Sequence, residues 1–392
     1  MSGRSGSRAR RAFLWLHRWI GLILGIVLVV IGLTGSILVF QREVDAALNP
    51  DLFRASTGEA TLSFDAAQHI AEQASGRPAG MIRPPDRVWP VWVVYDRRER
   101  RDSGSFWSTH IDPATGRVLG RRDAAASFVS TVRQLHEALL LRRLSGREIV
   151  GWLGVFLFAS SVSGIWLWWP RGKAGDGRWW RALTLVRRRP FVRLNLDLHS
   201  VAGIWISVVM AVTAFSGVAI VFPGWFRPAL GIAEPAPPRG DAQPRRGPPE
   251  VNADAAAVAA RAAVGSGQVV TAVTAPGPAA PNWIVTLRPQ GSDPELRIRT
   301  MVIVDPWSGV VVEERSPRTR GAAAEALAMQ RWLHGGQLLG LPGRLLVFSA
   351  GLALPVLFAT GLLAWAVRLR NTKRIAAQRA AAVALVRTEP AE

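Results

Sequence analysis

Four long runs without a charged residue constrain this chain more than any other feature. Residues 19–40, 149–169, 201–222 and 345–367 contain no Asp, Glu, Lys or Arg. At about 1.5 Å per residue, a helix of each run would cross the hydrocarbon core of a bilayer. The sequence therefore predicts an α-helical membrane protein with four transmembrane helices. The first run is too long for a signal peptide and lacks a small-residue cleavage site after it, so we expect it to be retained.

The basic residues predict how these helices are oriented. The chain has 48 Lys+Arg against 28 Asp+Glu, a net charge of +20, and most of the excess lies in residues 1–18, 170–200 and 368–392. By the positive-inside rule these three segments, and so both termini, are cytoplasmic. Residues 41–148 and 223–344 then face the periplasm of a bacterium whose inner membrane holds the chain. Because the charge sets topology, the expected partner is the lipid bilayer and not a nucleic acid.

Cysteine is absent from the sequence. This excludes disulfides, thiolate-held metals, covalent haem attachment and cysteine nucleophiles. There is no Walker or dinucleotide fingerprint, and no ionisable residue inside a span offers a proton relay for transport. Metal chemistry would therefore use histidine, carboxylate or methionine.

The sequence carries an internal repeat. Spans one and three share a histidine followed by glycines four and eighteen residues later: His17, Gly21 and Gly35 correspond to His199, Gly203 and Gly217. Spans two and four share a histidine, a Gly-Arg pair and a hydroxyl-glycine pair: His136, Gly146-Arg147 and Ser163-Gly164 correspond to His334, Gly343-Arg344 and Thr360-Gly361. We interpret the chain as a duplicated helix, outer segment and helix.

The two outer segments, residues 41–148 and 223–344, repeat a hairpin signature. Each has an Asp-Pro-x-x-Gly turn between apolar runs, at Asp112 to Gly116 and at Asp305 to Gly309, where proline presets φ and glycine accepts a positive φ. Helices are expected over residues 63–74 and 253–263. The sequence thus predicts one small α+β unit in each segment, and residues 234–250 read as an extended linker.

Four of the six histidines lie in matched places. His17 and His199 precede spans one and three at the cytoplasmic end, and His136 and His334 precede spans two and four at the periplasmic end. Two helices can supply imidazole ligands to one haem, so the pattern predicts two bis-histidine b-type haems, one near each membrane face. The alternative is that each histidine is an amphipathic anchor at the membrane interface.

The remaining candidates allow two interpretations each. Arg147 and Arg344 could bind haem propionates or phospholipid headgroups. The glycines of spans one and three leave room for a flat macrocycle or allow close helix packing. His69 and His110 have no matched partner, and we interpret them as ordinary outer-segment residues.

The repeated motifs resemble the PepSY-associated transmembrane family, iron-regulated inner-membrane proteins that include ferric-siderophore reductases. The motifs that carry the resemblance are Leu16-His-Arg-Trp-Ile-Gly21 with Leu33-Thr-Gly-Ser36, Leu135-His136 with Ser163-Gly-Ile-Trp-Leu-Trp-Trp-Pro-Arg171, Asp197-Leu-His199, and Leu333-His334-Gly335 with Gly343-Arg344 and Thr360-Gly361. The resemblance implies that the outer segments are PepSY-like units.

The resemblance also implies an activity, that of a four-helix haem b oxidoreductase. Electrons from quinol or a cytoplasmic reductant would reduce a periplasmic ferric chelate, such as a ferric siderophore. Two alternatives stay open: a non-catalytic PepSY module that binds a protease or another periplasmic partner, and a permease for haem or an iron chelate.

Overall fold

The computed structural model describes residues 2–97, 106–170, 178–185, 190–232, 250–278, 280–292 and 300–388. The chain divides into two compact units, which we call the helical unit (Met1–Ser36, Ile149–Val218, Leu346–Glu392) and the sheet unit (Ile37–Glu148, Ala219–Leu345). The predicted linker 234–250, apart from its last residue, lies outside the described residues, as do residues 171–177 and 186–189 of the predicted cytoplasmic loop.

Four long helices supply the helical unit and cover the four predicted spans to within one residue: α1 (Ser2–Val39), α6 (Gly146–Trp168), α8 (Phe191–Val221) and α13 (Gly340–Thr388). Each of them is long and apolar enough to cross a membrane, which confirms the prediction of four such helices. The inward and outward faces of each apolar span differ little in polarity, because lipid is as apolar as the interior of the helix bundle.

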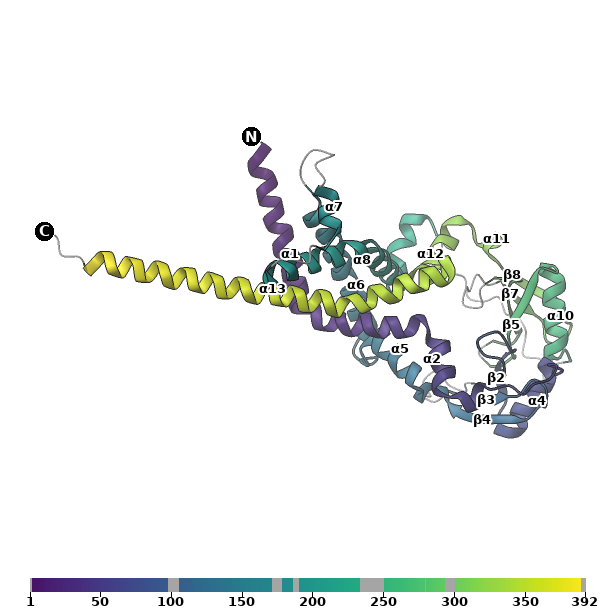
Figure 1. The fold of residues 1–392 in the computed structure, drawn as a ribbon. Helices are drawn as coiled ribbons and strands as arrows, with labels where there is room; N and C mark the ends of the chain where they lie inside the picture. Colours follow the sequence, from purple (N-terminus) through teal and green to yellow (C-terminus); the bar gives the residue numbers. More distant parts are fainter. Residues whose placement is uncertain are drawn as a thin grey trace. The chain divides into compact units, whose positions relative to one another are not determined.

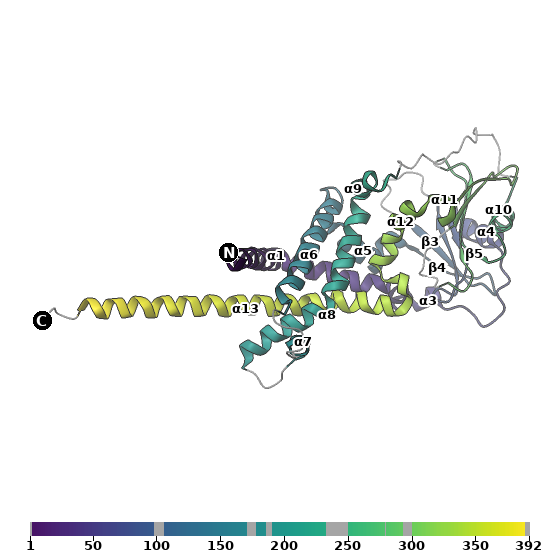
Figure 2. The same ribbon diagram turned by 90° about the horizontal axis from the view of Figure 1, so that it is seen from above.

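Small residues bring these helices together. A side chain at Gly32 would meet Leu354 and the Gly351 carbonyl of α13 at 2.4 and 3.0 Å, and the Ser36 hydroxyl donates to the Phe348 carbonyl at 2.8 Å. Gly154 of α6 lies against α8, and these two helices run side by side in Figure 2. Helix packing is therefore one use of these glycines.

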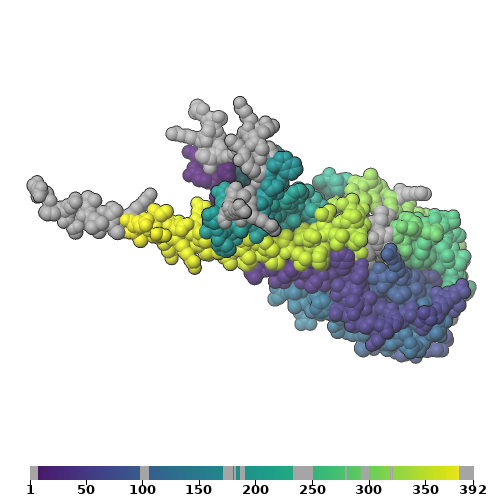
Figure 3. Space-filling view, in the orientation of Figure 1, coloured from purple at the N-terminus to yellow at the C-terminus, as the bar shows by residue number. Residues whose placement is uncertain are grey.

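The sheet unit contains one eight-stranded antiparallel sheet with the order β4-β3-β2-β1-β5-β6-β7-β8. Its strands are β1 (Ala79–Arg83), β2 (Trp92–Asp96), β3 (Trp107–Ile111), β4 (Val118–Asp123), β5 (Gln268–Thr274), β6 (Trp283–Pro289), β7 (Thr300–Val304) and β8 (Val311–Arg315). The two halves touch in the space-filling view, with residues 41–148 in purple and blue and the residues from 250 in green (Figure 3).

The two predicted α+β units thus share a single sheet instead of standing apart. The first strand of each half would be an exposed edge by itself, and β1 pairs with β5 in the register Met81↔Thr274 and Ile82↔Val273. This pairing satisfies backbone groups that would otherwise be left open along both edges.

Two helices cover one face of the sheet, α4 (Phe64–Ser75) and α10 (Ala253–Val264) (Figure 1). They match the helices predicted over residues 63–74 and 253–263. Asp254 accepts hydrogen bonds from the Phe64 and Asp65 amides at 2.9 and 3.1 Å, and Asp65 accepts one from the Ala253 amide at 2.9 Å. Each helix therefore satisfies N-terminal amides of the other, where a carboxylate is also favoured by the helix dipole.

The two predicted hairpin turns are present. Asp112 Oδ1 accepts from the Ala114 and Thr115 amides, and Gly116 has φ +72°. In the second hairpin Asp305 Oδ1 accepts from the next two amides after its proline, and Gly309 has φ +70°. The left-handed backbone at both glycines explains why the turn sequence requires glycine there.

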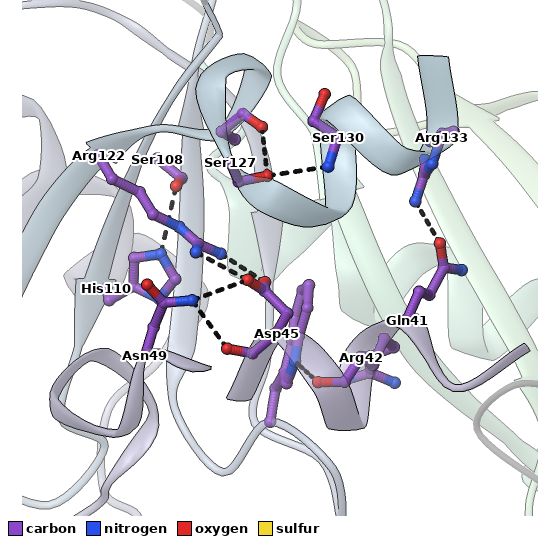
Figure 4. A network of polar contacts seen from close by, with 12 residues as sticks. Gln41, Arg42, Asp45, Asn49, Ser108, His110, Arg122, Ser127, Ser130 and Arg133 are labelled. Carbon is purple, nitrogen blue, oxygen red and sulfur yellow. Dashed lines mark hydrogen bonds and ion pairs between the residues drawn. The ribbon is translucent and has the colours of Figure 1, made fainter. Parts of the chain in front are cut away.

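The other face of the sheet holds a polar network between its helices and strands (Figure 4). Arg122 pairs with Asp45 at 2.5 Å, and Asn49 donates to the same carboxylate. Next to them His110 is 1% exposed, with Nε2 3.2 Å from the Ser108 hydroxyl. His110, interpreted from the sequence as an ordinary outer-segment residue, is therefore a buried residue of the sheet unit.

Shorter helices complete the described chain. The α-helices are α2 (Gln41–Leu48), α3 (Pro50–Phe53), α5 (Phe128–Ala138), α7 (Arg178–Leu183), α9 (Pro223–Phe226), α11 (Pro317–Arg320) and α12 (Ala322–His334), and the 3-10 turns are η1 (Ala124–Ala126), η2 (Pro228–Leu230) and η3 (Gln337–Leu339). Of these, α5 and α12 carry the second predicted pair of histidines.

Candidate histidine-pair sites

His17 lies on α1 and is held by α6. Its Nδ1 lies 3.0 Å from the carbonyl oxygen of Ser160 and 3.3 Å from the hydroxyl of Ser163. A carbonyl oxygen can only accept, so Nδ1 carries the ring proton of the neutral imidazole. The Nε2 atom is then left with its lone pair, which is the form that binds a metal.

His199 lies on α8 and is held by α13 in the same way. Its Nδ1 lies 3.1 Å from the carbonyl oxygen of Leu357 and 2.9 Å from the hydroxyl of Thr360. Within the described part of the chain, the hydrogen bonds of both His17 and His199 involve Nδ1. Hydrogen bonds to the ring nitrogen that does not bind the metal orient metal-binding histidines.

The rings of His17 and His199 face each other within the helical unit. Their centroids are 6.2 Å apart and their planes meet at 83°. With metal–nitrogen bonds of about 2.0 Å and a nitrogen about 1.15 Å from its ring centroid, two imidazoles on opposite sides of one ion have centroids about 6.3 Å apart. The observed separation would therefore suit one metal ion held between the two imidazoles.

The second predicted pair is brought together in the sheet unit. His136 lies in the last turn of α5, and His334 is the last residue of α12. Their ring centroids are 6.1 Å apart with planes at 54°. This separation also fits a shared metal ion, so the structure joins the histidines in the two pairs expected from the repeat.

A pair of imidazoles fills only two positions of an octahedral iron. Among the residues that the structure describes, no three His, Asp or Glu side chains are grouped to hold a metal ion. The four equatorial nitrogens of a porphyrin would supply the missing donors. The donor set at both pairs therefore fits haem better than a bare metal ion.

Glycines lie directly against the first pair. A Cβ built on Gly164 would be 3.2 Å from His17 Cε1, and a Cβ on Gly361 would be 3.3 Å from His199 Cε1. Both distances are shorter than ordinary van der Waals contact, so a side chain at either position would displace the imidazole. One turn beyond His17, a Cβ on Gly21 would meet nothing within 4 Å, whereas one turn beyond His199 a Cβ on Gly203 would be 3.8 Å from Leu357 Cδ2.

The two candidate arginines bind helix ends. Arg344 is 6% exposed and donates to the Val39 carbonyl at 2.9 Å and to Glu43 at 2.5 Å. Arg147 is exposed and donates to the Ile220 carbonyl at 3.2 Å. Both guanidinium groups thus serve terminal carbonyls, of α1 and α8 respectively, where a cation is favoured by the helix dipole.

The two unmatched histidines lie away from the ring pairs. His69 is exposed on α4, with Nε2 3.0 Å from Gln73 Nε2. His110 lies in the core described above, where burial and the nearby Arg122 lower its pKa to about 3. Neither histidine joins another imidazole in the described residues.

The four histidines were predictable from the sequence, but the residues that contact His17 and His199 were not. Ser163-Gly164 and Thr360-Gly361 are repeat-matched dipeptides, yet nothing in their spacing says that they touch the histidine of the preceding span. Their equal spacing from the Gly146-Arg147 and Gly343-Arg344 pairs was the only available signal. The arginine contacts to helix ends were also missed, because the carbonyls involved carry no side-chain signature.

Comparison with known proteins supports the membrane architecture. The family model described as the PepSY-associated TM region matches residues 14–368. No curated protein matches the chain significantly. The eight-stranded antiparallel sheet fits PepSY-like units, and the four apolar helices fit the transmembrane region. The chain therefore belongs to the PepSY-associated TM region family.

Proposed function

We propose that this protein is a membrane oxidoreductase with two b-type haems, which passes electrons across the bilayer to a ferric chelate. The observation that carries the proposal is the pairing of four repeat-matched histidines at centroid separations of 6.2 and 6.1 Å. When bound, each haem would supply a one-electron Fe(III)/Fe(II) couple.

The residues of the chain would prepare these sites. His17 and His199 present Nε2 because their Nδ1 protons are directed to α6 and α13. Gly164 and Gly361 allow the rings to lie against the helix backbone, and Gly21 leaves open space beside them. Preorganised ligands of this kind bind more tightly because little side-chain freedom is lost on binding.

The direction of transfer follows from the proposed topology. Basic termini favour a cytoplasmic location for both ends of the chain in a bacterial inner membrane. His17 and His199 would then serve the side facing a cytoplasmic or quinol donor, and His136 and His334 the periplasmic side. The acceptor would be a ferric chelate of the siderophore class, so that iron is released as Fe(II).

We also infer that the chain arose by internal duplication. The two halves repeat the same helix and four strands in the sheet unit, the same Asp-Pro turns, and the same contacts from Nδ1 to a carbonyl and a hydroxyl. Arg147 contacts the end of α8 and Arg344 the end of α1, so each arginine contacts the end of the first span of the other half. Matched contacts in both units support the descent of the two halves from one ancestral sequence.

The deciding experiment is an optical spectrum of the purified full chain before and after dithionite, with haem counted per chain. We expect reducible b-type bands and two haems. His17→Ala and His199→Ala should each remove the same haem, whereas His136→Ala and His334→Ala should remove the other. The exposed His69→Ala is the matched control and should keep both.

Other outcomes decide between the alternatives. A colourless protein that retains binding of a periplasmic partner would favour the non-catalytic module. Uptake of haem or chelate into vesicles without any reductant would favour the permease. Reduction of several ferric chelates by the prereduced protein would then identify the substrate class.

A further inference from the structure

Two hydroxyl groups approach the first histidine pair with their direction already set. The Ser163 hydroxyl lies 3.0 Å from the Ser160 carbonyl and donates to it. The Thr360 hydroxyl donates to the Val356 carbonyl at 2.7 Å. A hydroxyl has one proton, so toward the imidazoles each oxygen can act only as an acceptor.

The Nδ1 proton of His199 is therefore shared between two acceptors, a backbone carbonyl and a hydroxyl oxygen. His17 Nδ1 has the same two kinds of acceptor and, in addition, the Ser160 hydroxyl at 3.3 Å. For His199 the hydroxyl contact is the shorter one, at 2.9 Å against 3.1 Å to the carbonyl. For His17 the carbonyl is closer, at 3.0 Å against 3.3 Å. Ser163 is fully buried and Thr360 is 7% exposed, so water does not compete strongly for these oxygens.

We infer that Ser163 and Thr360 are positioning residues, which add a hydroxyl acceptor at the Nδ1 protons of His17 and His199 and tune the redox potential of the iron between them. Acceptors at Nδ1–H increase the electron donation from Nε2. Stronger donation stabilises Fe(III) more than Fe(II), which lowers the midpoint potential. The inference rests on the proposed function, because it assigns these residues to the haem held by this pair.

The test is a redox titration of the full-length haem-loaded protein with Ser163→Ala or Thr360→Val. Valine keeps the shape of threonine and removes only the hydroxyl. Outer-shell substitutions change metal affinity by about tenfold or more. If loss of one acceptor changes the Fe(III)/Fe(II) affinity ratio by about tenfold, the midpoint rises by about 59 mV for a one-electron couple. The shift should be larger for Thr360→Val, whose hydroxyl is closer.

The chain offers matched controls for this experiment. Ser161 is also a buried serine of α6 that donates to a carbonyl of its own helix, Leu157 at 2.9 Å. Ser161→Ala should leave the midpoint potentials of both haems unchanged. Thr360→Ser should keep the wild-type midpoint, unlike Thr360→Val, because serine retains the hydroxyl. The haem of His136 and His334 provides a second reference within the same molecule.

The results separate this inference from the proposed function. Unchanged midpoints in both hydroxyl variants, or an equal shift with Ser161→Ala, would overturn the inference while leaving the haem assignment intact. Absence of haem from the wild-type protein would instead refute the proposed function. In that case ¹⁵N NMR of labelled histidine still tests the hydroxyl contacts: a shift of the His199 Nδ1 resonance in Thr360→Val but not in Ser161→Ala supports them, and no shift in Thr360→Val overturns them.

Discussion

A buried histidine, His110, makes the free energy of unfolding of the sheet unit depend on pH. His110 is 1% exposed, and its ring packs against Phe53 with centroids 4.9 Å apart. Burial, with a smaller contribution from Arg122, lowers its pKa from 6.5 to about 3. Protonation would place an additional cation beside Arg122 in a core that excludes water, so the folded state keeps the ring neutral.

The sign and size of the effect follow from proton linkage. Below pH 6.5 the unfolded chain binds a proton at this histidine and the folded chain does not, so stability falls as the pH is lowered from 6.5 toward 3. Between pH 7.5 and pH 5 the loss is about 2 kcal/mol, at 1.36 kcal/mol per pH unit below the unfolded value. At pH 5 this loss is insensitive to the folded pKa, because pH 5 lies well above it.

The assay compares urea midpoints at pH 7.5 and pH 5 for the full chain and for His110→Phe, which removes the titrating group and keeps a ring of similar shape. A loss of about 2 kcal/mol corresponds to a midpoint shift of about 1 M for a typical urea dependence of 1–3 kcal/mol/M. Cleavage of the sheet unit in a brief proteolysis pulse reports its unfolding.

The comparison cancels other titrating groups, because they are present in both proteins. His110→Phe should lose about 2 kcal/mol less than the wild type between the two pH values, whatever its stability at pH 7.5. The exposed His69→Gln is the control and should follow the wild type. Equal pH dependence in wild type and His110→Phe would refute the reasoning.

Three further perturbations have a stated direction. Leu140 has φ +60° and is 55% exposed, so Leu140→Gly should raise the thermal midpoint by relieving up to about 1 kcal/mol of backbone strain; a lower midpoint would contradict this. Gly164→Ala should reduce haem occupancy at the adjacent histidine pair, measured as haem per chain, while the other haem is retained; full occupancy would show that the ring can move. Arg344→Met should destabilise the fold by about 2–4 kcal/mol in urea unfolding, because it strips the Val39 carbonyl and Glu43 of a buried donor; a cost below about 1 kcal/mol would show that water replaces the guanidinium.

The features that were predictable from sequence depend on local patterns. A helix that crosses a bilayer needs a continuous apolar run, so the four spans are visible in the printed sequence. The Asp-Pro-x-x-Gly turns were predictable because proline and glycine restrict the backbone at their own positions. The histidine pairs were predictable because matched places before repeated spans imply similar depth in a membrane.

The features that were missed depend on contacts between distant segments. Pairing of β1 with β5 joins residues near 82 and 273. The sequence of each strand does not show whether the strand pairs with the other half or stays at the edge of its own half. The contact of Ser163 with His17 depends on the rotation of α6 against α1. Apolar residues surround these transmembrane helices on every side, so their sequence gives little sign of which face is turned inward.

The reciprocal contacts indicate how the two halves fit together. In a two-fold interface, residue i contacts j and j contacts i. Asp65 and Asp254 exchange hydrogen bonds with the opposite helix N-terminus in the sheet unit. In the helical unit, His17 faces its repeat partner His199. Each unit therefore has the contact pattern of a symmetric dimer within one chain. Each histidine pair takes one ring from each half of the chain, so each of the two proposed haem sites would need both halves.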